Sequence, residues 1–593
     1  MNFRFRGPFL RCWTPWAVGV LVVAQAVGAA PPVSNRVELR NKLARRLASL
    51  PHAETAVGAC VIDLASGETV FELRADQPLL PASNAKVFAI AAALHTLGPD
   101  FVFETRLATD GVNLLLIGDG DPALGDPRLA RARGEVLTEV FVRWADALHR
   151  AGHAAFPGDL IVDESVFDEQ WTHPAWEPED LGKWYAAPVG ALNFNDNCVD
   201  IALLPTTAGQ PVEVRVTPPG TIVEIVNQCR TASEGTPILR HKQDSFSYLI
   251  TGRCSKRWPF APVSFPDPGR FTADVLLTIL RERGIRVAGS VRRAEVRRPD
   301  GSVPDSVSIL AVERTPLVDV LLRAGKDSQN LFAECLLKRT GHAWARRAGE
   351  PIARGTWTTG ASAVHAYLAE TGLDLAGLVI SDGSGLSREN RCTARQLAGL
   401  LAHVAGRPEG KLFRGCLSVA GVDGSMRKHL KDSAGVVWAK TGTMRGVRTL
   451  SGYVAGPSAP VRAASGSDAL SSPTPAQRLP AAGQPAGEVA DAEAGADTEA
   501  DSSDDLASEA FAAEDRAADE ATDDDRAADE SISTDHAAEQ SAAGDPVFAF
   551  AILFNGYRGS SHPYRRIQDD FCRVLLDAAA DRTAAPSPRA PAR

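Results

Sequence analysis

The sequence has little of what metal and nucleic-acid sites are built from. Its 593 residues include 9 cysteines and 12 scattered histidines, with no C-x-x-C or H-E-x-x-H pattern, so we expect no metal and no cofactor. The G-D-G-D-P stretch at 118–122 lacks the full calcium-loop pattern, and we expect it to form a turn after a strand at 112–117. No nucleic-acid-binding motif occurs, so nucleic acid is not an expected partner.

Long apolar runs are also scarce. Arginines at positions 4, 6 and 11 precede the apolar run 16–27, and three small residues follow it. This pattern is typical of a secretory signal peptide, so we expect residues 1–30 to direct export to the periplasm or cell envelope. The run is short for a membrane span; an uncleaved anchor remains an alternative, and a peripheral membrane contact stays open. In an oxidising compartment, Cys229 and Cys254 are a candidate disulfide pair.

Acidic residues are concentrated in one segment. Residues 456–545 hold 22 aspartates and glutamates against 4 arginines, a net charge of −18, whereas the whole chain has −10 and the remainder therefore +8. The segment nearly lacks aromatic residues and repeats the string D-R-A-A-D-E, so we expect it to be disordered. The flanking stretches 450–454 and 547–554 resemble buried strands, which places the segment in one hairpin loop. A cationic remainder suits contact with an anionic envelope polymer.

Three short strings carry the residue types of an acyl-transfer site. They are Ser83-Asn84-Ala85-Lys86, Ser328-Gln329-Asn330 and Lys440-Thr441-Gly442. Ser83 and Lys86 are three residues apart, so on a helix their side chains share a face and a hydroxyl lies beside an amine that can act as its base. A bare S-x-x-K is expected about once by chance in a chain of this length, whereas the ordered trio is much rarer.

The residues after Ser83 predict the helix that this pairing requires. Apolar residues recur from Val87 to Leu97, Pro81 precedes the segment and Gly98 follows it. Ser83 would then lie at the helix N-terminus, where free backbone N–H groups favour an oxyanion and help to keep a nearby amine neutral.

The remaining periodicity predicts an α/β layered fold. Helical spacing occurs at 36–47 and 564–575, near opposite ends of the chain, and strand patterns occur at 57–63 and 70–73. A long β-rich stretch separates the first string from the second, with strand patterns at 160–162, 198–203, 212–216, 221–226 and 246–250. We expect one or two inserted domains there.

With these motifs the chain resembles the class C low-molecular-mass penicillin-binding proteins, the D-alanyl-D-alanine carboxypeptidase/endopeptidase family typified by penicillin-binding protein 4. The similarity runs from about Val37 to Leu576 without the acidic segment, and it includes Y-A-A-P at 185–188, D-G-S-G-L-S at 382–387 and K-T-G-T-M-R-G at 440–446. The resemblance implies a transpeptidase-like domain of the serine β-lactamase type, with helices around an antiparallel sheet, and inserted β-rich domains.

The resemblance and the composition together predict the domain limits. They are a signal peptide at 1–30, a transpeptidase-like domain at 31–105, 306–455 and 546–579, an inserted domain at 106–185 and 266–305, a nested β-rich domain at 186–265, an acidic disordered insert at 456–545 and a disordered tail at 580–593.

The chemistry carried over from the family is hydrolysis of peptidoglycan stem peptides through an acyl-enzyme, with β-lactams as covalent inhibitors. Ser83 would attack the carbonyl between the two terminal D-alanines, and Lys86 would take its proton, with a pKa lowered by burial and by Lys440. Ser328 would relay that proton to the leaving amine, and Asn330 would orient Lys86 or the substrate amide.

The substrate would be held by the third string. Lys440, Thr441 and Gly442 would bind the terminal carboxylate, and the N–H groups of Ser83 and Thr443 would form the oxyanion hole. Asp163 would contact a cationic end of the peptide, with a turn or capping role as its alternative.

Two other functions remain open. A serine β-lactamase shares this chemistry, but it should place its second string closer than 245 residues after Ser83, and no clear E-x-x-L-N element occurs here. A non-catalytic peptidoglycan-binding protein would keep the scaffold without turnover. The choice between carboxypeptidase and endopeptidase activity and the oligomeric state also stay open.

Overall fold

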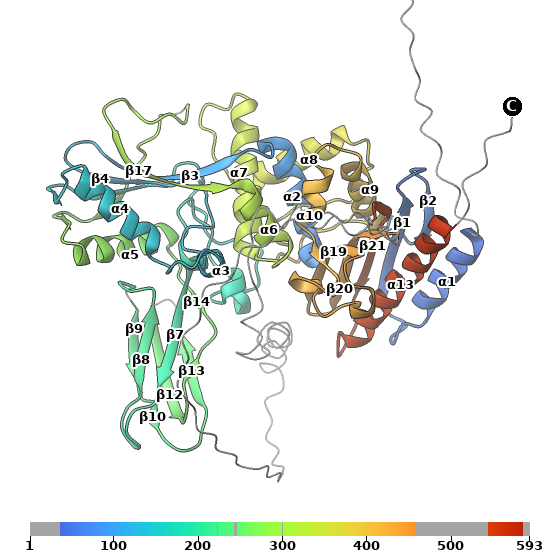
Figure 1. The fold of residues 1–593 in the computed structure, drawn as a ribbon, viewed down its shortest axis with the longest axis horizontal. Coiled ribbons are helices and arrows are strands. Elements are labelled where there is room, and N and C mark those ends of the chain that lie inside the picture. The colour runs from blue at the N-terminus through green and yellow to red at the C-terminus, as the bar shows by residue number, and fades with distance from the viewer. Residues whose placement is uncertain (1–35, 222, 242–245, 299, 457–543, 585–593) are drawn as a thin grey trace, which may run out of the picture.

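The computed structural model describes residues 36–221, 223–241, 246–298, 300–456 and 544–584. The expected signal peptide and almost all of the acidic insert lie outside these residues. One half of the molecule is built on a six-stranded antiparallel sheet in the order β18-β19-β20-β21-β1-β2 (Figure 1). The mixed α/β architecture with helices around an antiparallel sheet confirms the expected fold class.

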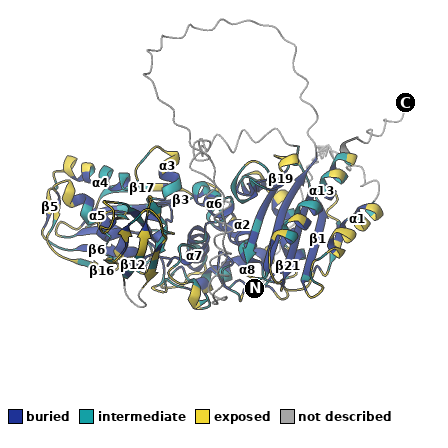
Figure 2. Ribbon diagram, turned by 90° about the horizontal axis from the view of Figure 1, so that it is seen from below, coloured by how far each residue is buried: buried dark blue, intermediate teal, exposed yellow. Residues whose placement is uncertain are grey.

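The central sheet takes its strands from both ends of the chain. The expected strands on either side of the acidic insert are confirmed, because they pair with each other and bring Ala455 opposite Pro546. Both are almost fully buried, since helices cover the two faces of the sheet (Figure 2). The six strands are β1 (Ala56–Asp63), β2 (Thr69–Leu73), β18 (Ser418–Val419), β19 (Val437–Met444), β20 (Val447–Ala455) and β21 (Pro546–Asn555).

Helices α1 (Arg36–Ala48) and α13 (His562–Ala584) pack on one face of this sheet, as their apolar periodicity predicted. Helix α13 continues to Ala584, so the expected disordered tail from residue 580 is wrong for its first five residues. The extension is stabilised by Arg582, whose Nη2 lies 2.6 Å from the buried carboxylate of Asp63. The helices towards the other face are α2 (Ala85–Leu97), α6 (Leu317–Gly325), α7 (Asn330–Arg347), α8 (Trp357–Glu370), α9 (Ala394–Ala405) and α10 (Gly410–Gly415).

The inserted part contains a five-stranded sheet in the order β16-β6-β4-β3-β17. Strands β3 and β17 lie partly or wholly outside the expected limits of 106–185 and 266–305, because this long antiparallel pair leads out of the other domain and back into it. The strands are β3 (Val102–Thr109), β4 (Leu114–Ile117), β6 (Leu160–Asp163), β16 (Val291–Arg293) and β17 (Ser308–Pro316), with the short pair β5 (Ala155–Phe156) and β15 (Arg286–Val287), and with helices α3 (Pro127–Ala132), α4 (Glu139–Arg150) and α5 (Pro268–Glu282).

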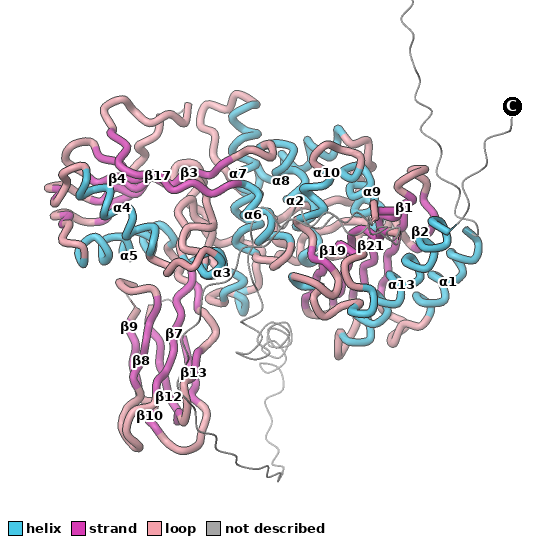
Figure 3. Tube along the Cα trace, viewed as in Figure 1, coloured by secondary structure: helices cyan, strands magenta, loops and turns pink. Residues whose placement is uncertain are grey.

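Two small four-stranded sheets follow within residues 198–264 and project from the inserted part as a unit whose described residues form no α-helix (Figure 3). Cys229 and Cys254 are both buried in this unit as free thiols, so the expected disulfide is not present. The Cys254 thiol instead donates to the carbonyl of Lys256 at 2.9 Å. The strands are β7 (Cys198–Leu204), β8 (Glu213–Thr217), β9 (Glu224–Asn227), β10 (Arg230–Thr231), β11 (Pro237–His241), β12 (Ser247–Cys254), β13 (Trp258–Pro259) and β14 (Val263–Ser264).

Candidate active site

The first string forms the turn that leads into α2. A short 3₁₀ turn, Ala82–Asn84, runs into the α-helix at Ala85, and Gly98 with φ 86° ends that helix as the sequence predicted. Ser83 is partly exposed, whereas Lys86 is fully buried one turn later. The Lys86 Nζ lies 3.0 Å from the Ser83 hydroxyl oxygen, so the expected serine–lysine pair is formed.

The amine of Lys86 has two further partners, both of which can only accept its protons. Its Nζ donates to Asn330 Oδ1 at 2.7 Å and to the carbonyl of Ser384 at 2.8 Å. Asn330 is itself fixed, because its Nδ2 donates to the carbonyl of Tyr185 at 2.7 Å. A neutral amine has two N–H bonds and one lone pair, so these two acceptors direct the lone pair towards the Ser83 hydroxyl.

Burial lowers the pKa of Lys86 to about 7, from an ordinary value of 10.5. Two buried carboxylates, Glu334 and Asp382, oppose this shift and favour the charged amine. The Lys440 cation, which the sequence argument named as a second cause, is not among the causes of this shift. About half of the Lys86 amines are therefore neutral near pH 7 and able to accept a proton.

Sequence reasoning did not identify Glu334, which lies one helical turn after Asn330 on α7. Its carboxylate is fully buried and accepts hydrogen bonds from the backbone N–H groups of Gly383 (2.9 Å) and Ser384 (2.8 Å). Trp357 Nε1 adds a third bond at 2.8 Å. Burial raises the pKa of Glu334 to about 7, and the charge of Asp382 adds to this shift. Glu334 thus holds the N–H of Ser384, the residue whose carbonyl contacts the catalytic amine. The i, i+4 spacing from Asn330 was the available signal.

The second and third strings meet beside this group. Lys440 is fully buried in β19, and its Nζ donates to Ser328 Oγ and to the carbonyl of Thr441, both at 2.8 Å. The Thr441 hydroxyl donates to Ser425 Oγ at 2.8 Å. Ser328 has a left-handed backbone with φ 58°, a conformation disfavoured for residues with a Cβ and frequent at functional sites.

Gly442 brings strand β19 against the nucleophile. A Cβ at this position would lie 3.0 Å from the Ser83 nitrogen and 2.2 Å from Thr449 Oγ1, so no side chain fits. Thr443 follows in the same strand and pairs with Arg448 of β20. Four of the five residues expected to bind the substrate, those at 440–443, therefore lie in the strand that approaches Ser83.

The structure does not bring Asp163 into this cluster. Its fully buried carboxylate lies at the end of β6, in the inserted sheet. One oxygen accepts from the N–H of Ser165 at 2.8 Å, and the other accepts from the N–H groups of Val296 and Arg297 at 2.9 Å. These contacts correspond to the turn and capping alternative.

Known proteins resemble the chain in both sequence and fold. A sequence model of the D-Ala-D-Ala carboxypeptidase 3 (S13) family matches residues 39–472. The D-alanyl-D-alanine carboxypeptidase of Actinomadura sp. is 32% identical over 469 residues, which cover 73% of this chain and 82% of that protein.

Among solved structures, penicillin binding protein 4 from Haemophilus influenzae has a TM-score of 0.61 at 20% identity, covering 91% of this chain and 99% of that one. The same protein complexed with a β-lactam has a TM-score of 0.56 at 19% identity over the same shares of the two chains. At this identity the two structures establish the fold only. Family membership is established by the sequence-model match and by the Actinomadura relative. The chain is therefore a member of the D-Ala-D-Ala carboxypeptidase family of serine peptidases.

Proposed function

We propose that this enzyme is a serine-type D-Ala-D-Ala carboxypeptidase that acts on peptidoglycan stem peptides through an acyl-enzyme on Ser83. The observation that carries the proposal is the environment of Lys86. Two fixed acceptors hold its amine, burial lowers its pKa to about 7, and the remaining electron pair faces the Ser83 hydroxyl. This is what a general base beside a serine nucleophile requires at neutral pH.

In the acylation step, Ser83 Oγ attacks the carbonyl carbon of the penultimate D-alanine and its proton passes to Lys86. The N–H groups of Ser83 and Thr443 stabilise the negative charge that develops on the carbonyl oxygen, and one such donor contributes about 10²–10³ in rate. The close approach of β19 at Gly442 supports this pairing of donors.

The C–N bond then breaks, and the leaving amine of D-alanine must take a proton. Ser328 supplies it and is reprotonated from Lys86, while the Lys440 ammonium, 2.8 Å from Ser328 Oγ, favours this transfer. Lys440 and Thr441 bind the terminal carboxylate of the substrate, where a fixed cation and a hydroxyl are suitable partners. Water hydrolyses the acyl-enzyme by the same route in reverse.

The same nucleophile would be acylated by β-lactams, which become covalent inhibitors if hydrolysis of the adduct is slow. Cleavage of cross-links between stem peptides, the endopeptidase activity that the family resemblance implies, is included in the proposal. The proposed substrate and the predicted signal peptide both support a location in the periplasm or cell envelope. Across the residues that the structure describes, no helix combines the length and the apolar character needed to cross a bilayer.

The proposal is tested by incubating purified protein with muropeptides and measuring D-alanine release and product masses. We expect release by the wild type, none by Ser83→Ala, and normal release by Ser362→Ala, which removes a serine hydroxyl on α8 bonded only to its own helix. Turnover by Ser83→Ala would contradict the assignment. Rapid hydrolysis of penicillin without D-alanine release would instead identify a β-lactamase, and absence of both reactions a binding protein.

A further inference from the structure

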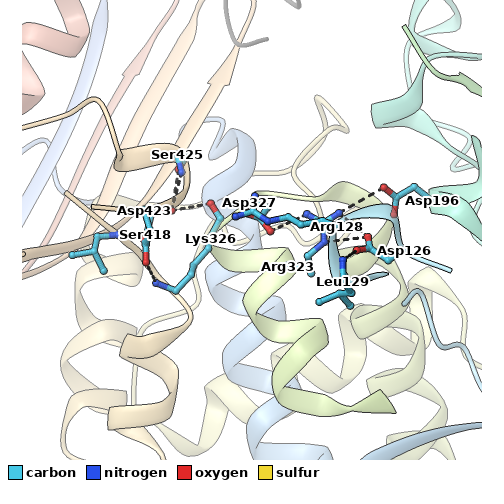
Figure 4. A network of polar contacts seen from close by, with 11 residues as sticks. Asp126, Arg128, Leu129, Asp196, Arg323, Lys326, Asp327, Ser418, Asp423 and Ser425 are labelled. Atoms are coloured by element: carbon cyan, nitrogen blue, oxygen red, sulfur yellow. Dashed lines mark hydrogen bonds and ion pairs between the residues drawn. The ribbon is translucent and has the colours of Figure 1, made fainter. Parts of the chain in front are cut away.

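The backbone turn that carries Ser328 is held from outside the active site. On one side, the carbonyl of Lys326 accepts hydrogen bonds from Ser418 Oγ at 2.9 Å and from the N–H of Ser425 at 3.1 Å. These two serines (Figure 4) belong to β18 and to the short turn that follows it. Strand β18 pairs with β19, the strand of Lys440. On the other side, the turn is held by Arg323 and by residues of the inserted part of the chain.

Arg323 on α6 is the centre of a buried ion-pair network. Its Nη2 lies 2.7 Å from Asp126 Oδ2, and its Nη1 lies 2.8 Å from Asp327 Oδ2. Asp327 directly precedes Ser328 and also pairs with Arg128 at 2.6 Å. Asp126 and Arg128 belong to the inserted part, so these pairs connect it to the turn (Figure 4). Each of these carboxylates, like the Arg323 guanidinium, is less than a tenth exposed, so the pairs are only weakly screened.

Asp196 forms a second connection to the same turn. Its Oδ2 accepts a hydrogen bond from Gln329 Nε2 at 3.0 Å and lies 3.6 Å from Arg323 Nη2. Gln329 is the middle residue of the second string, between Ser328 and Asn330. Its side-chain oxygen also accepts from the N–H of Asn330 at 2.8 Å and so begins helix α7.

The backbone that presents Asp196 is itself unusual. Asn195, Asp196 and Asn197 are consecutive non-glycine residues with φ of 50°, 54° and 55°. Single left-handed residues of this type are common, but three in sequence are strongly disfavoured and persist only where the surroundings impose them. Here the side chains of Asn195 and Asn197 hold the turn, with Nδ2 atoms that donate to the carbonyls of Cys198 and Pro188, both at 2.8 Å.

Asp196 lies in a cluster of buried charges. Three carboxyl groups, on Asp126, Asp196 and Asp327, face two guanidinium groups, on Arg128 and Arg323. Although 16% of the Asp196 side chain is exposed, burial of the carboxyl and the charge of Asp126 raise its pKa well above its usual range. An asparagine at position 196 would keep a side-chain oxygen that can accept the hydrogen bond from Gln329 Nε2.

We propose that Asp196 and Arg323 are positioning residues for the reaction: through Gln329 and Asp327 they hold Ser328 in its left-handed conformation against Lys440, so the inserted domain sets the competence of the active site. The proposal rests on the proposed function of Ser328 as the proton relay. Neither residue contacts the reacting atoms, and both act through the turn.

The test compares Asp196→Ala, Asp196→Asn and Gln329→Ala in the full-length enzyme, using the limiting rate of acylation by a fluorescent penicillin. A misplacement of about 1 Å can cost about 100-fold in rate, so we expect a loss of about that size in Asp196→Ala and in Gln329→Ala, with the half-saturating penicillin concentration changed by less than about threefold. Asp196→Asn should recover to within about threefold of the wild type, which a general loss of structure would not explain. An alanine variant that acylates within about threefold of the wild type overturns the proposal.

A matched control is Asp159→Ala. This aspartate also lies in the inserted part, accepts from the backbone N–H of Ser290 at 2.8 Å and pairs with Arg292 at 3.1 Å. Within the described residues, none of its hydrogen bonds or ion pairs reaches the turn that carries Ser328. We expect its acylation rate to equal that of the wild type, and a loss equal to that of Asp196→Ala would overturn the proposal. If Asp196→Ala does not fold, the acylation rate of Gln329→Ala decides the question, because that variant removes the donor of the same hydrogen bond.

Amide hydrogen exchange separates this proposal from the proposed function. We expect the amides of residues 327–330 to exchange faster in Asp196→Ala than in Asp159→Ala, because the turn loses the hydrogen bond between Asp196 and Gln329. Unchanged exchange there overturns the positioning role even if the wild type proves inactive towards penicillin. Absence of acylation in the wild type would instead refute the proposed function.

Discussion

Replacing Glu334 by glutamine should shift the pH dependence of acylation to lower pH. The reaction needs neutral Lys86, whose pKa is lowered by burial to about 7, so the wild-type rate should fall about tenfold for each pH step below that value. The Glu334 charge favours the protonated amine. Removing it therefore lowers the pKa of Lys86 further and keeps the base neutral at lower pH.

The size of the shift follows from the geometry. One residue separates the two groups, because Ser384 accepts from Lys86 at 2.8 Å through its carbonyl and donates to Glu334 at 2.8 Å through its N–H. Two unit charges about 8 Å apart at an effective dielectric constant of about 20 interact by about 2 kcal/mol, or about 1.5 pH steps. Glu334 has a pKa raised to about 7 and is only partly charged there, so we expect the midpoint to move from about pH 7 to about pH 6.

The assay is the rate of penicillin acylation measured from pH 5 to 9, with each variant normalised to its own plateau. Glu389→Gln is the control, because that exposed carboxylate contacts Ser381 Oγ in the same loop and is not among the causes of the Lys86 shift. Its midpoint should stay near that of the wild type. A midpoint for Glu334→Gln that is unchanged or moves to higher pH would refute the reasoning.

Three further predictions concern the same structure. Gly442→Ala would place a Cβ 2.2 Å from Thr449 Oγ1. It should therefore reduce the free energy of unfolding in urea by about 1–3 kcal/mol and the acylation rate by at least about tenfold. A variant with unchanged stability and unchanged acylation would contradict the close approach of β19. Lys86→Met should abolish activity yet stabilise the fold, by at most about 5 kcal/mol, because the folded pKa lies below the unfolded value of 10.5. That gain should be full below about pH 7 and vanish as the pH rises towards 10.5, and a destabilised variant at pH 6 would contradict it. Deleting residues 463–544 should leave D-alanine release nearly unchanged, since Ala455 and Pro546 are already paired; a large loss would show that the segment takes part.

Local patterns in the sequence were sufficient to predict the helix that carries the nucleophile and its base. The apolar stripe and Gly98 defined α2, and three-residue spacing placed Lys86 beside Ser83. The two strands around the acidic insert were also predictable, because each is a short apolar run bounded by polar sequence.

Features that arise only when distant segments meet were not predictable. Nothing in the second string indicates the left-handed backbone of Ser328, because neighbouring contacts impose it. The influence of Glu334 on Lys86 depends on the path of the backbone through Gly383 and Ser384, which is set by tertiary packing. The two alternatives for Asp163 could not be separated for a related reason, since an aspartate after a strand caps a turn as readily as it lines a cleft, and its contacts fit the capping role.

The most direct test of the acyl-enzyme claim is to map the site of penicillin attachment by mass spectrometry of proteolytic peptides. We predict a single penicilloyl adduct on the peptide that contains Ser83, lost in Ser83→Ala and retained in Ser362→Ala. An adduct on any other serine, or an adduct that persists in Ser83→Ala, would contradict the account.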